Sequence, residues 1–234
     1  MAAVDRSLIS NLPLFAGLSA EQLDQVLQGA RAVRHAKDTI VFEEGGEAHS
    51  FFILLHGHLQ VIKTTPDGQQ VVVRYVAPGE IFGIAMAMGL KAYPATAVAV
   101  EDSVVLTWPV GVWPTLVARF PNLATNTMQT IGNRLQDAHT RVVEMSTEQV
   151  ERRVAHALLR LAKQAGRRTD GGVQIDFPIS RQDVAEMTGT TLHTVSRILS
   201  AWEQQGLVES GRQRIVLCDP HRLFGLAEGV SRKE

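Results

Sequence analysis

The sequence lacks several features that mark common protein classes. Its single cysteine among 234 residues, Cys218, cannot form an internal disulfide or, alone, hold an iron–sulfur cluster. No segment approaches the roughly 18 consecutive uncharged apolar residues that a membrane helix needs. Residues 1–14 also lack the long apolar stretch of a secretory signal. These absences predict a cytoplasmic protein without a membrane anchor.

A strong net charge is also missing, because the formal charge of the chain is −1. This value argues against a non-specific nucleic-acid coat protein. Residues 1–146 hold 10 Lys and Arg against 13 Asp and Glu, a difference of −3, and residues 147–234 hold 13 against 11, a difference of +2. The sign of the asymmetry favours the C-terminal part as the one that faces phosphate groups.

The N-terminal half has the pattern of a β-structure that follows a short helix. Ser19 and Gln22 form a capping-box pattern ahead of an apolar helix face made by Leu23, Val26 and Leu27. Strands are then predicted over residues 39–42, 51–55, 59–62, 71–76, 96–100 and 104–108, separated by Gly and Pro turn signals. Short strands at this spacing are typical of an antiparallel sandwich or barrel, expected as a domain over residues 1–111.

A long helix is predicted over residues 112–146. Apolar residues recur in it with alternating steps of three and four, which is the a/d pattern of a coiled coil: Met128, Ile131, Leu135, Ala138, Val142 and Met145. This narrow stripe favours a parallel pairing of two chains, while packing of the helix on its own barrel is the alternative. Ser146 and Gln149 form a second capping-box pattern, which predicts a hinge and a new helix.

The remaining residues, 147–234, contain a helix-turn-helix pattern. Ser180 and Asp183 are suited to cap one short helix, Gly189 lies in a turn, and Thr191 begins a second helix that ends near Gly206. A polar loop is expected at residues 166–172, and a two-stranded wing after Gly206. Val195, Ile198, Leu199 and Trp202 make the expected buried face of the second helix.

The opposite face of that second helix would enter the major groove of DNA. Arginine can donate two hydrogen bonds to guanine there, and a helix N-terminus favours phosphate binding. The alternative is a helical hairpin with an ordinary solvated face. The predicted DNA-binding residues are Ser180, Arg181, Thr191, His193, Thr194, Ser196 and Arg197, with Arg212 and Arg214 in the wing.

Residues 179–199, together with Gly45-Gly46 and Pro78-Gly79-Glu80-Ile81-Phe82-Gly83, resemble the catabolite-activator/fumarate–nitrate-regulator (CRP/FNR) family. The resemblance covers about residues 15–217. It implies an α+β fold with a cyclic-nucleotide-binding-type jelly-roll barrel, a dimerisation helix and a winged helix-turn-helix. It also implies a homodimeric transcription regulator that reads a palindromic site, with RNA polymerase as its downstream partner. His193 stands where the family often has Glu, which leaves the base opposite it open.

Several effectors of the family do not suit this sequence. Ile84 and Ala95 stand where cyclic-AMP-binding members have the ribose glutamate and the phosphate arginine, which argues against cyclic AMP. The single cysteine argues against an oxygen-sensing cluster, and Ala85 stands where the carbon-monoxide-sensing haem member has its histidine. The expected effector pocket comprises Phe82, Gly83, Ile84, Met86, Met88 and Thr96.

The same segment resembles that of the nitric-oxide-responsive denitrification regulators, which would imply a haem with a histidine ligand. The candidate ligands are His35, His49, His56, His58 and His139. Three alternatives remain. The methionines can be ordinary core residues; the regulator can lack an effector and be controlled by its abundance; or His56 and His58, facing one side of a strand, can belong to a cupin-like metalloenzyme.

Overall fold

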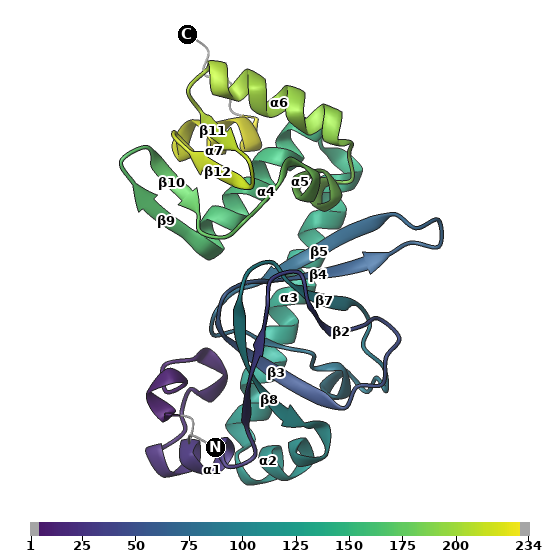
Figure 1. The fold of residues 1–234 in the computed structure, drawn as a ribbon, viewed down its shortest axis with the longest axis vertical. Helices are drawn as coiled ribbons and strands as arrows, with labels where there is room; N and C mark the ends of the chain where they lie inside the picture. The colour runs from purple at the N-terminus through teal and green to yellow at the C-terminus, as the bar shows by residue number, and fades with distance from the viewer. Residues whose placement is uncertain (1–4, 230–234) are drawn as a thin grey trace. The chain divides into compact units, whose positions relative to one another are not determined.

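The structure, a computed structural model, describes residues 5–229. The chain forms two compact units (Figure 1). The first contains the chain up to Lys63 and Arg74–Asp137, and the second contains Thr64–Val73 and the chain from Ala138 onward. The division therefore falls inside a long helix, α3 (Pro121–Thr147), rather than at its end.

The first unit begins with short helices: η1 (Arg6–Leu8), η2 (Pro13–Phe15) and α1 (Ala20–Leu27). The capping box predicted for α1 is confirmed, because the Ser19 amide donates to Gln22 Oε1 at 2.8 Å and the Gln22 amide donates to Ser19 Oγ at 3.3 Å. The predicted apolar face of α1 is also buried.

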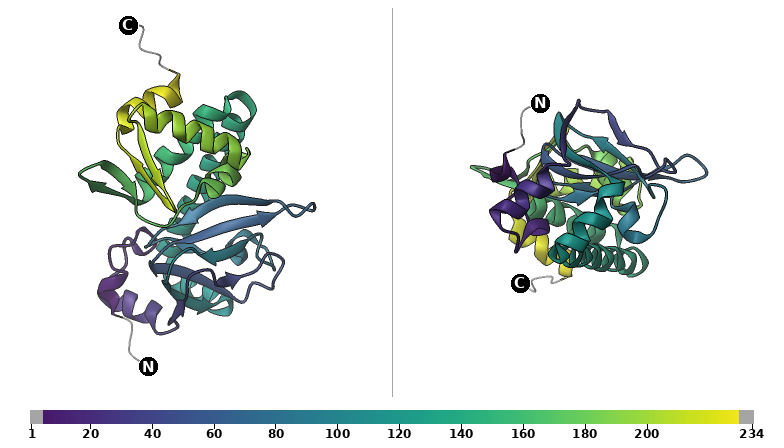
Figure 2. Two further views of the ribbon diagram at one scale, coloured as in Figure 1. Left: turned by 45° about the horizontal axis from the view of Figure 1, so that its top comes forward. Right: turned by 90° about the horizontal axis from the view of Figure 1, so that it is seen from below.

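Two antiparallel sheets make the barrel (Figures 1 and 2), as the predicted fold class requires, and all of the barrel belongs to the first unit except residues 64–73, where one strand ends and the next begins. One sheet has the order β1 (Arg31–His35), β8 (Ser103–Pro109), β3 (Ser50–His56) and β6 (Ile81–Phe82). The other has the order β2 (Ile40–Phe42), β7 (Thr96–Ala99), β4 (Leu59–Thr64) and β5 (Gln70–Val76). The sequence did not predict β1, whose exposed residues show no alternation of polar and apolar character.

The barrel interior is filled with apolar side chains. Four aromatic rings gather there, with centroids 4.0 Å apart for Phe42 and Tyr93, 5.1 Å for Phe52 and Phe82, and 5.6 Å for Phe42 and Phe52. A second apolar cluster joins the outer side of β3 and β8 to α1 and to the start of α3. The two clusters together hold the unit by burial of apolar surface.

The expected single helix over residues 112–146 consists of separate elements. After η3 (Ala85–Met88) and the two last barrel strands come η4 (Val110–Val112), α2 (Trp113–Arg119) and then α3. Phe120 leaves the helical conformation immediately before Pro121, which occupies the first position of α3. Proline is suited to that position because it has no amide hydrogen to leave unpaired.

The predicted cap at Ser146 is wrong. Its hydroxyl donates to the Val142 carbonyl at 2.8 Å, so Ser146 lies within α3. The next helix, α4 (Val150–Ala165), begins after Gln149, which makes no side-chain capping bond. Because the Ser146 hydroxyl bonds to the carbonyl of the residue four positions earlier in the same helix, it does not cap the next helix, although the spacing to Gln149 indicates a cap.

The second unit combines helices with one small sheet. After α4 come β9 (Gly166–Thr169), β10 (Gly172–Ile175), α5 (Arg181–Thr188), α6 (Leu192–Gln204), β11 (Val208–Gly211), β12 (Arg214–Leu217) and α7 (Pro220–Glu228). The sheet order is β11, β12, β10, β9. The sequence did not predict α7.

The polar loop expected at residues 166–172 is also wrong, because β9 and β10 form a hairpin there. Gly172 has a φ of +131°, and a Cβ atom on it would collide with the Leu217 carbonyl of the wing. The glycines that suggest a loop therefore permit close approach of strands. Within the described range, no helix has the length and apolarity needed to cross a membrane.

Candidate nucleic-acid interface and sensor interior

Helices α5 and α6 pack together with a short glycine-containing turn between them (Figure 1). The cap of α5 is reciprocal, since the Asp183 amide donates to Ser180 Oγ at 3.1 Å and the Ser180 amide donates to Asp183 Oδ2 at 2.7 Å. Gly189 ends α5 with a φ of +61°, and the Thr191 hydroxyl accepts from the Thr194 amide at 3.2 Å to begin α6. The local sequence therefore sets the turn between the two helices.

One face of α6 is anchored in the core of the second unit. Val195, Leu199 and Trp202 are fully buried, and Ile198 is half-buried. The indole N–H of Trp202 donates to Glu151 Oε1 of α4 at 3.0 Å. This anchoring fixes the rotation of α6 about its own axis, and so it determines which side chains face outward.

The outward residues are those that the sequence predicts for DNA contact. His193 and Arg197 are exposed, while Thr194 and Ser196 are half-buried. Within residues 5–229, neither His193 nor Arg197 has a side-chain hydrogen bond or ion pair. Their donors are consequently open to an external acceptor, whereas the Thr191 and Thr194 hydroxyls lie 3.0 Å apart and bond to each other.

Arg181 and Ser180, both predicted to bind phosphate, have partners inside the unit. Arg181 Nη2 donates to Ser210 Oγ of the wing at 2.7 Å and lies 3.5 Å from Glu203 Oε1 of α6. Glu203 also accepts from the Ser210 amide at 2.9 Å. The Ser180 hydroxyl lies 2.6 Å from Asp183 Oδ2. Arg181 thus joins α5, α6 and the wing, a role that its position in the sequence did not indicate.

The wing tip carries the other predicted basic residues. Arg212 is exposed and has no side-chain hydrogen bond or ion pair within residues 5–229, and Gln213 beside it adopts a φ of +56°. Arg214 is held on the sheet by Glu209 at 3.1 Å and by Gln174 at 3.2 Å. Arg212 is therefore the wing arginine with open donors.

The predicted seam of α3 divides into exposed and covered positions. Met128, Leu135 and Val142 are 75%, 55% and 62% exposed, and they recur every seven residues. Met145 is also exposed, as is Val143, which the seam pattern did not include. Ile131 and Ala138 are half-buried, and Ile131 packs against the outer apolar cluster of its unit. One helix thus serves its own barrel and also presents an uncovered apolar row.

The six residues expected to form an effector pocket have different surroundings. Phe82 and Ile84 are buried, and a Cβ atom on Gly83 would lie 2.7 Å from the Phe52 ring. Thr96 Oγ1 accepts from the Glu44 amide at 3.0 Å. Met86 packs against the outer cluster, whereas Met88 is 44% exposed. The barrel side of this segment is thus occupied by the stacked rings.

The candidate haem ligands do not fit an axial role in that interior. His49, His56 and His139 are exposed, and His35 lies on the edge strand β1. His58 Nδ1 lies 2.7 Å from Glu101 Oε1. The buried interior cluster contains aromatic and aliphatic residues and no histidine. The residues present therefore give no haem pocket in the barrel.

The cupin-like arrangement of His56 and His58 is wrong. β3 ends at His56, Gly57 turns with a φ of +83°, and β4 begins at Leu59. The two imidazoles therefore differ in environment, with His56 exposed and His58 buried beside Glu101. Among residues 5–229, no group of three or more His, Cys, Asp or Glu side chains is arranged to hold a metal ion.

A half-buried charge cluster beside β6 was not foreseen from the sequence. Arg74 Nη1 lies 2.6 Å from Glu80 Oε2, and Arg134 of α3 lies 3.9 Å from the same oxygen and donates to the Ile81 carbonyl. The pKa of Arg134 is lowered to about 9, chiefly by burial and also by the charge of Arg74, while Glu80 opposes the change. Only the tertiary fold brings these residues together.

Comparison with known proteins gives two family matches. A Crp-like helix-turn-helix domain matches residues 152–225, and a cyclic nucleotide-binding domain matches residues 32–120. These ranges contain the α5–α6 motif with its wing and the barrel, respectively.

Curated relatives are similar over most of the chain. The Cyclic AMP receptor protein of Thermus thermophilus is 29% identical over 219 residues, covering 94% of this chain and 98% of that protein. The transcriptional activator protein FnrA of Stutzerimonas stutzeri is 26% identical over 210 residues, covering 90% and 85%. Among solved structures, FixK2 from Bradyrhizobium japonicum has a TM-score of 0.75 at 25% identity, covering 84% of this chain and 96% of that one.

Proposed function

Because the chain belongs to the CRP/FNR family of DNA-binding transcription regulators, we propose that it works as a homodimer whose two α6 helices read a palindromic DNA site. The observation that carries the proposal is the pair of exposed side chains His193 and Arg197, which lack partners within residues 5–229 and lie on a helix held by its buried face. The proposed partners are duplex DNA, a second copy of the chain and, downstream, RNA polymerase. These partners imply work in the cytoplasm and no catalytic activity.

Arg197 is proposed to read guanine. A guanidinium donates two parallel hydrogen bonds to guanine O6 and N7, and such a pair discriminates against other bases by about 1–3 kcal/mol. His193 can donate to a guanine acceptor or accept from an amino group, according to its tautomer. Ser196, Thr191 and Thr194 would complete the groove contacts, with Arg212 on an adjacent phosphate.

Dimerisation is proposed along α3. The exposed apolar row at Met128, Leu135 and Val142 would be removed from water by the same row of a second chain. A twofold pair of recognition helices then matches half-sites about one helical turn, roughly 34 Å, apart. Met145 would extend the row toward the C-terminal end of α3.

The sensor unit supports a second candidate mode of control, in which abundance rather than a ligand in the barrel sets activity. The relative from Thermus thermophilus is named for cyclic AMP. In this chain the buried Ile84 and Ala95 offer no group for a ribose or a phosphate, and stacked rings occupy the interior. A phosphate needs a positive partner or several N–H donors when it is partly buried.

The test of the DNA proposal is selection of bound duplexes from a random pool by the full chain, without added small molecules. We expect a palindromic motif with guanine at one position of each half-site. A pool that shows no preferred sequence would contradict the proposed reading.

The mode of control is tested with the selected duplex. Binding by freshly purified protein that has no Soret absorption band and receives no added ligand supports control by abundance. Binding that appears only with cyclic AMP, haemin or nitric oxide contradicts it.

A further inference from the structure

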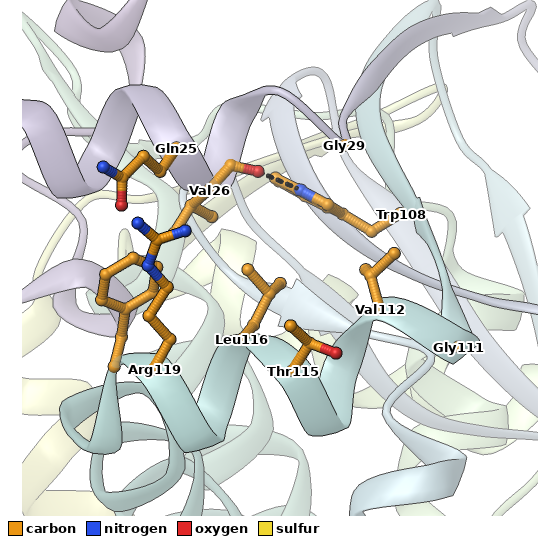
Figure 3. Close-up of a pocket in the computed structure, with 10 residues that line it drawn as sticks. Gln25, Val26, Gly29, Trp108, Gly111, Val112, Thr115, Leu116 and Arg119 are labelled. Carbon is orange, nitrogen blue, oxygen red and sulfur yellow. Dashed lines mark hydrogen bonds between the residues drawn. The ribbon is translucent and has the colours of Figure 1, made fainter.

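A groove in the first unit has no part in the barrel interior or in the DNA-reading face. It lies between α1 and α2 and is closed at its base by the end of β8, with a volume of about 280 Å³ (Figure 3). Small-molecule pockets in proteins are concave, mostly apolar and equipped with a few polar groups, with volumes of about 300–1,000 Å³. The volume of this groove is near the lower end of that range and suits a small molecule.

The apolar part of the groove is rigidly built. Trp108 is fully buried, and its indole N–H donates to the Val26 carbonyl of α1 at 2.8 Å (Figure 3). Phe51 stacks on Trp108 with ring centroids 5.3 Å apart. The indole N–H is therefore already bonded and its ring is fully covered, so Trp108 forms the rigid floor beneath the groove, while the half-buried Val112 and Leu116 on the α2 side present apolar surface to a ligand.

The polar part of the groove has one permanent charge. Arg119, the last residue of α2, is exposed and lies over the ring of Phe120 at 5.5 Å from its centroid. Within residues 5–229 it has no ion pair with a carboxylate. Figure 3 shows its guanidinium at the groove edge, opposite Gln25 of α1, while Thr115 lies one turn earlier on α2.

We propose that this groove binds a small monocarboxylate with an apolar tail. The planar guanidinium of Arg119 matches a carboxylate in two parallel hydrogen bonds. The tail would lie against Val112 and Leu116, above the floor that Trp108 forms, and would be removed from water there. One arginine without an acidic partner favours a single negative charge, and the volume favours a short tail. Binding here is independent of the proposed DNA function.

The experiment titrates the full chain with sodium hexanoate and, separately, with hexanamide, which has a similar tail but no charge. Calorimetry gives the affinities, and the indole N–H resonances of the three tryptophans report the location. We expect hexanoate to bind and to shift the Trp108 resonance while the Trp202 resonance stays in place. We expect hexanamide to bind about tenfold more weakly or worse, because a hydrogen bond to a charged group is lost.

Two pairs of variants separate the groove from other sites. Arg119→Gln should weaken hexanoate binding about tenfold or more, while Arg34→Gln, an exposed arginine of β1, should leave it unchanged. Gly111→Leu should obstruct the groove, while Gly171→Leu should have no effect. A Cβ atom at either glycine meets nothing within 4 Å, so both variants are expected to fold, as circular dichroism would verify.

Three outcomes would overturn the proposal. They are no hexanoate binding by the unaltered chain, equal affinities of the unaltered chain and Arg119→Gln, and a resonance shift confined to Trp202. The selection of DNA sites by the same preparation is a separate measurement. Failure of one proposal is therefore distinguishable from failure of the other.

Discussion

Arg197 on α6 and Phe82 on β6 are both residues expected to contact a ligand, yet their surroundings are opposite. Arg197 is exposed and has open donors, while Phe82 is 1% exposed and stacks among other rings. The first is a polar group on a rigid helix whose hydrogen-bonding capacity is unused inside the chain. The ring of Phe82 is already packed against the other aromatic rings of the barrel interior. We therefore expect a residue that a family motif points to as a ligand contact to act as one when its side chain also has unused hydrogen-bonding capacity, as that of Arg197 does.

The largest expected effect concerns the exposed row of α3, where apolar side chains lie exposed to water in the described chain. Leu135→Glu should convert the proposed dimer to monomers and lower affinity for the selected palindrome by about 10²–10⁴-fold, because linked half-site binding is lost. Light scattering gives the oligomeric state and a gel-shift titration gives the affinity. Gln129→Glu, also exposed on α3 but outside the seam pattern, is the control. If the Leu135→Glu variant remained a dimer with full DNA affinity, dimerisation along this row of α3 would be contradicted.

The next effect tests whether the barrel interior is a filled core. Phe82→Ala should lower the free energy of unfolding by about 3–5 kcal/mol, because it opens a cavity among stacked rings. Urea denaturation followed by circular dichroism measures this loss. Met88→Ala, at an exposed position of the same segment, should change stability by about 0.5 kcal/mol or less. Equal losses of unfolding free energy at Phe82 and Met88 would contradict the interpretation of Phe82 as part of a filled core, and with it the contrast to the exposed Arg197.

A smaller effect is expected for Arg197, the arginine proposed to read a base. Arg197→Ala should weaken binding to the selected palindrome by about 1–3 kcal/mol per contact and leave weak, salt-sensitive binding to random duplex. The measurement compares both affinities across a salt series. Arg222→Ala, on α7, is the control because Arg222 is exposed but donates to the Gln205 carbonyl. Equal losses of affinity for the selected and the random duplex would indicate that Arg197 contacts phosphate and does not read a base.

The smallest expected effect distinguishes two roles of Ser180, capping of α5 and binding of a phosphate. Ser180→Ala should cost about 1 kcal/mol of unfolding free energy, because it removes the hydroxyl acceptor of the α5 cap. If Ser180 also bonds phosphate, its loss lowers DNA affinity further than the loss of stability explains. Thr191→Ala, the equivalent cap of α6, gives the comparison. Unchanged stability of Ser180→Ala would contradict the capping geometry.

The sequence predicts elements well where local chemistry determines them. The caps at Ser19, Ser180 and Thr191 and the buried face of α6 are all local patterns, and the structure contains them. The alternating strands of the barrel belong to the same class. Such patterns depend on residues a few positions apart, which a sequence shows directly.

The sequence fails where a distant partner decides the outcome. A Cβ atom on Gly172 would collide with the Leu217 carbonyl, and Gly57, which turns the chain between His56 and His58, lies equally close to Ser103. Arg181 is held by Ser210 and Glu203, and Arg134 by Glu80 and the Ile81 carbonyl. None of these partners lies near enough in sequence to reveal the contact. Local reasoning therefore did not reveal that Arg181 joins α5, α6 and the wing, and it overlooked Arg134.

The exposed Met128, Leu135 and Val142 have a consequence for how such a regulator responds. If only the dimer binds its operator and dimerisation is weak, the concentration of dimers is proportional to the square of the concentration of free chains. Doubling synthesis would then raise promoter occupancy about fourfold at the low end of that range. A row of apolar side chains would then make promoter occupancy rise more steeply than the rate of translation, without the need for a metabolite signal.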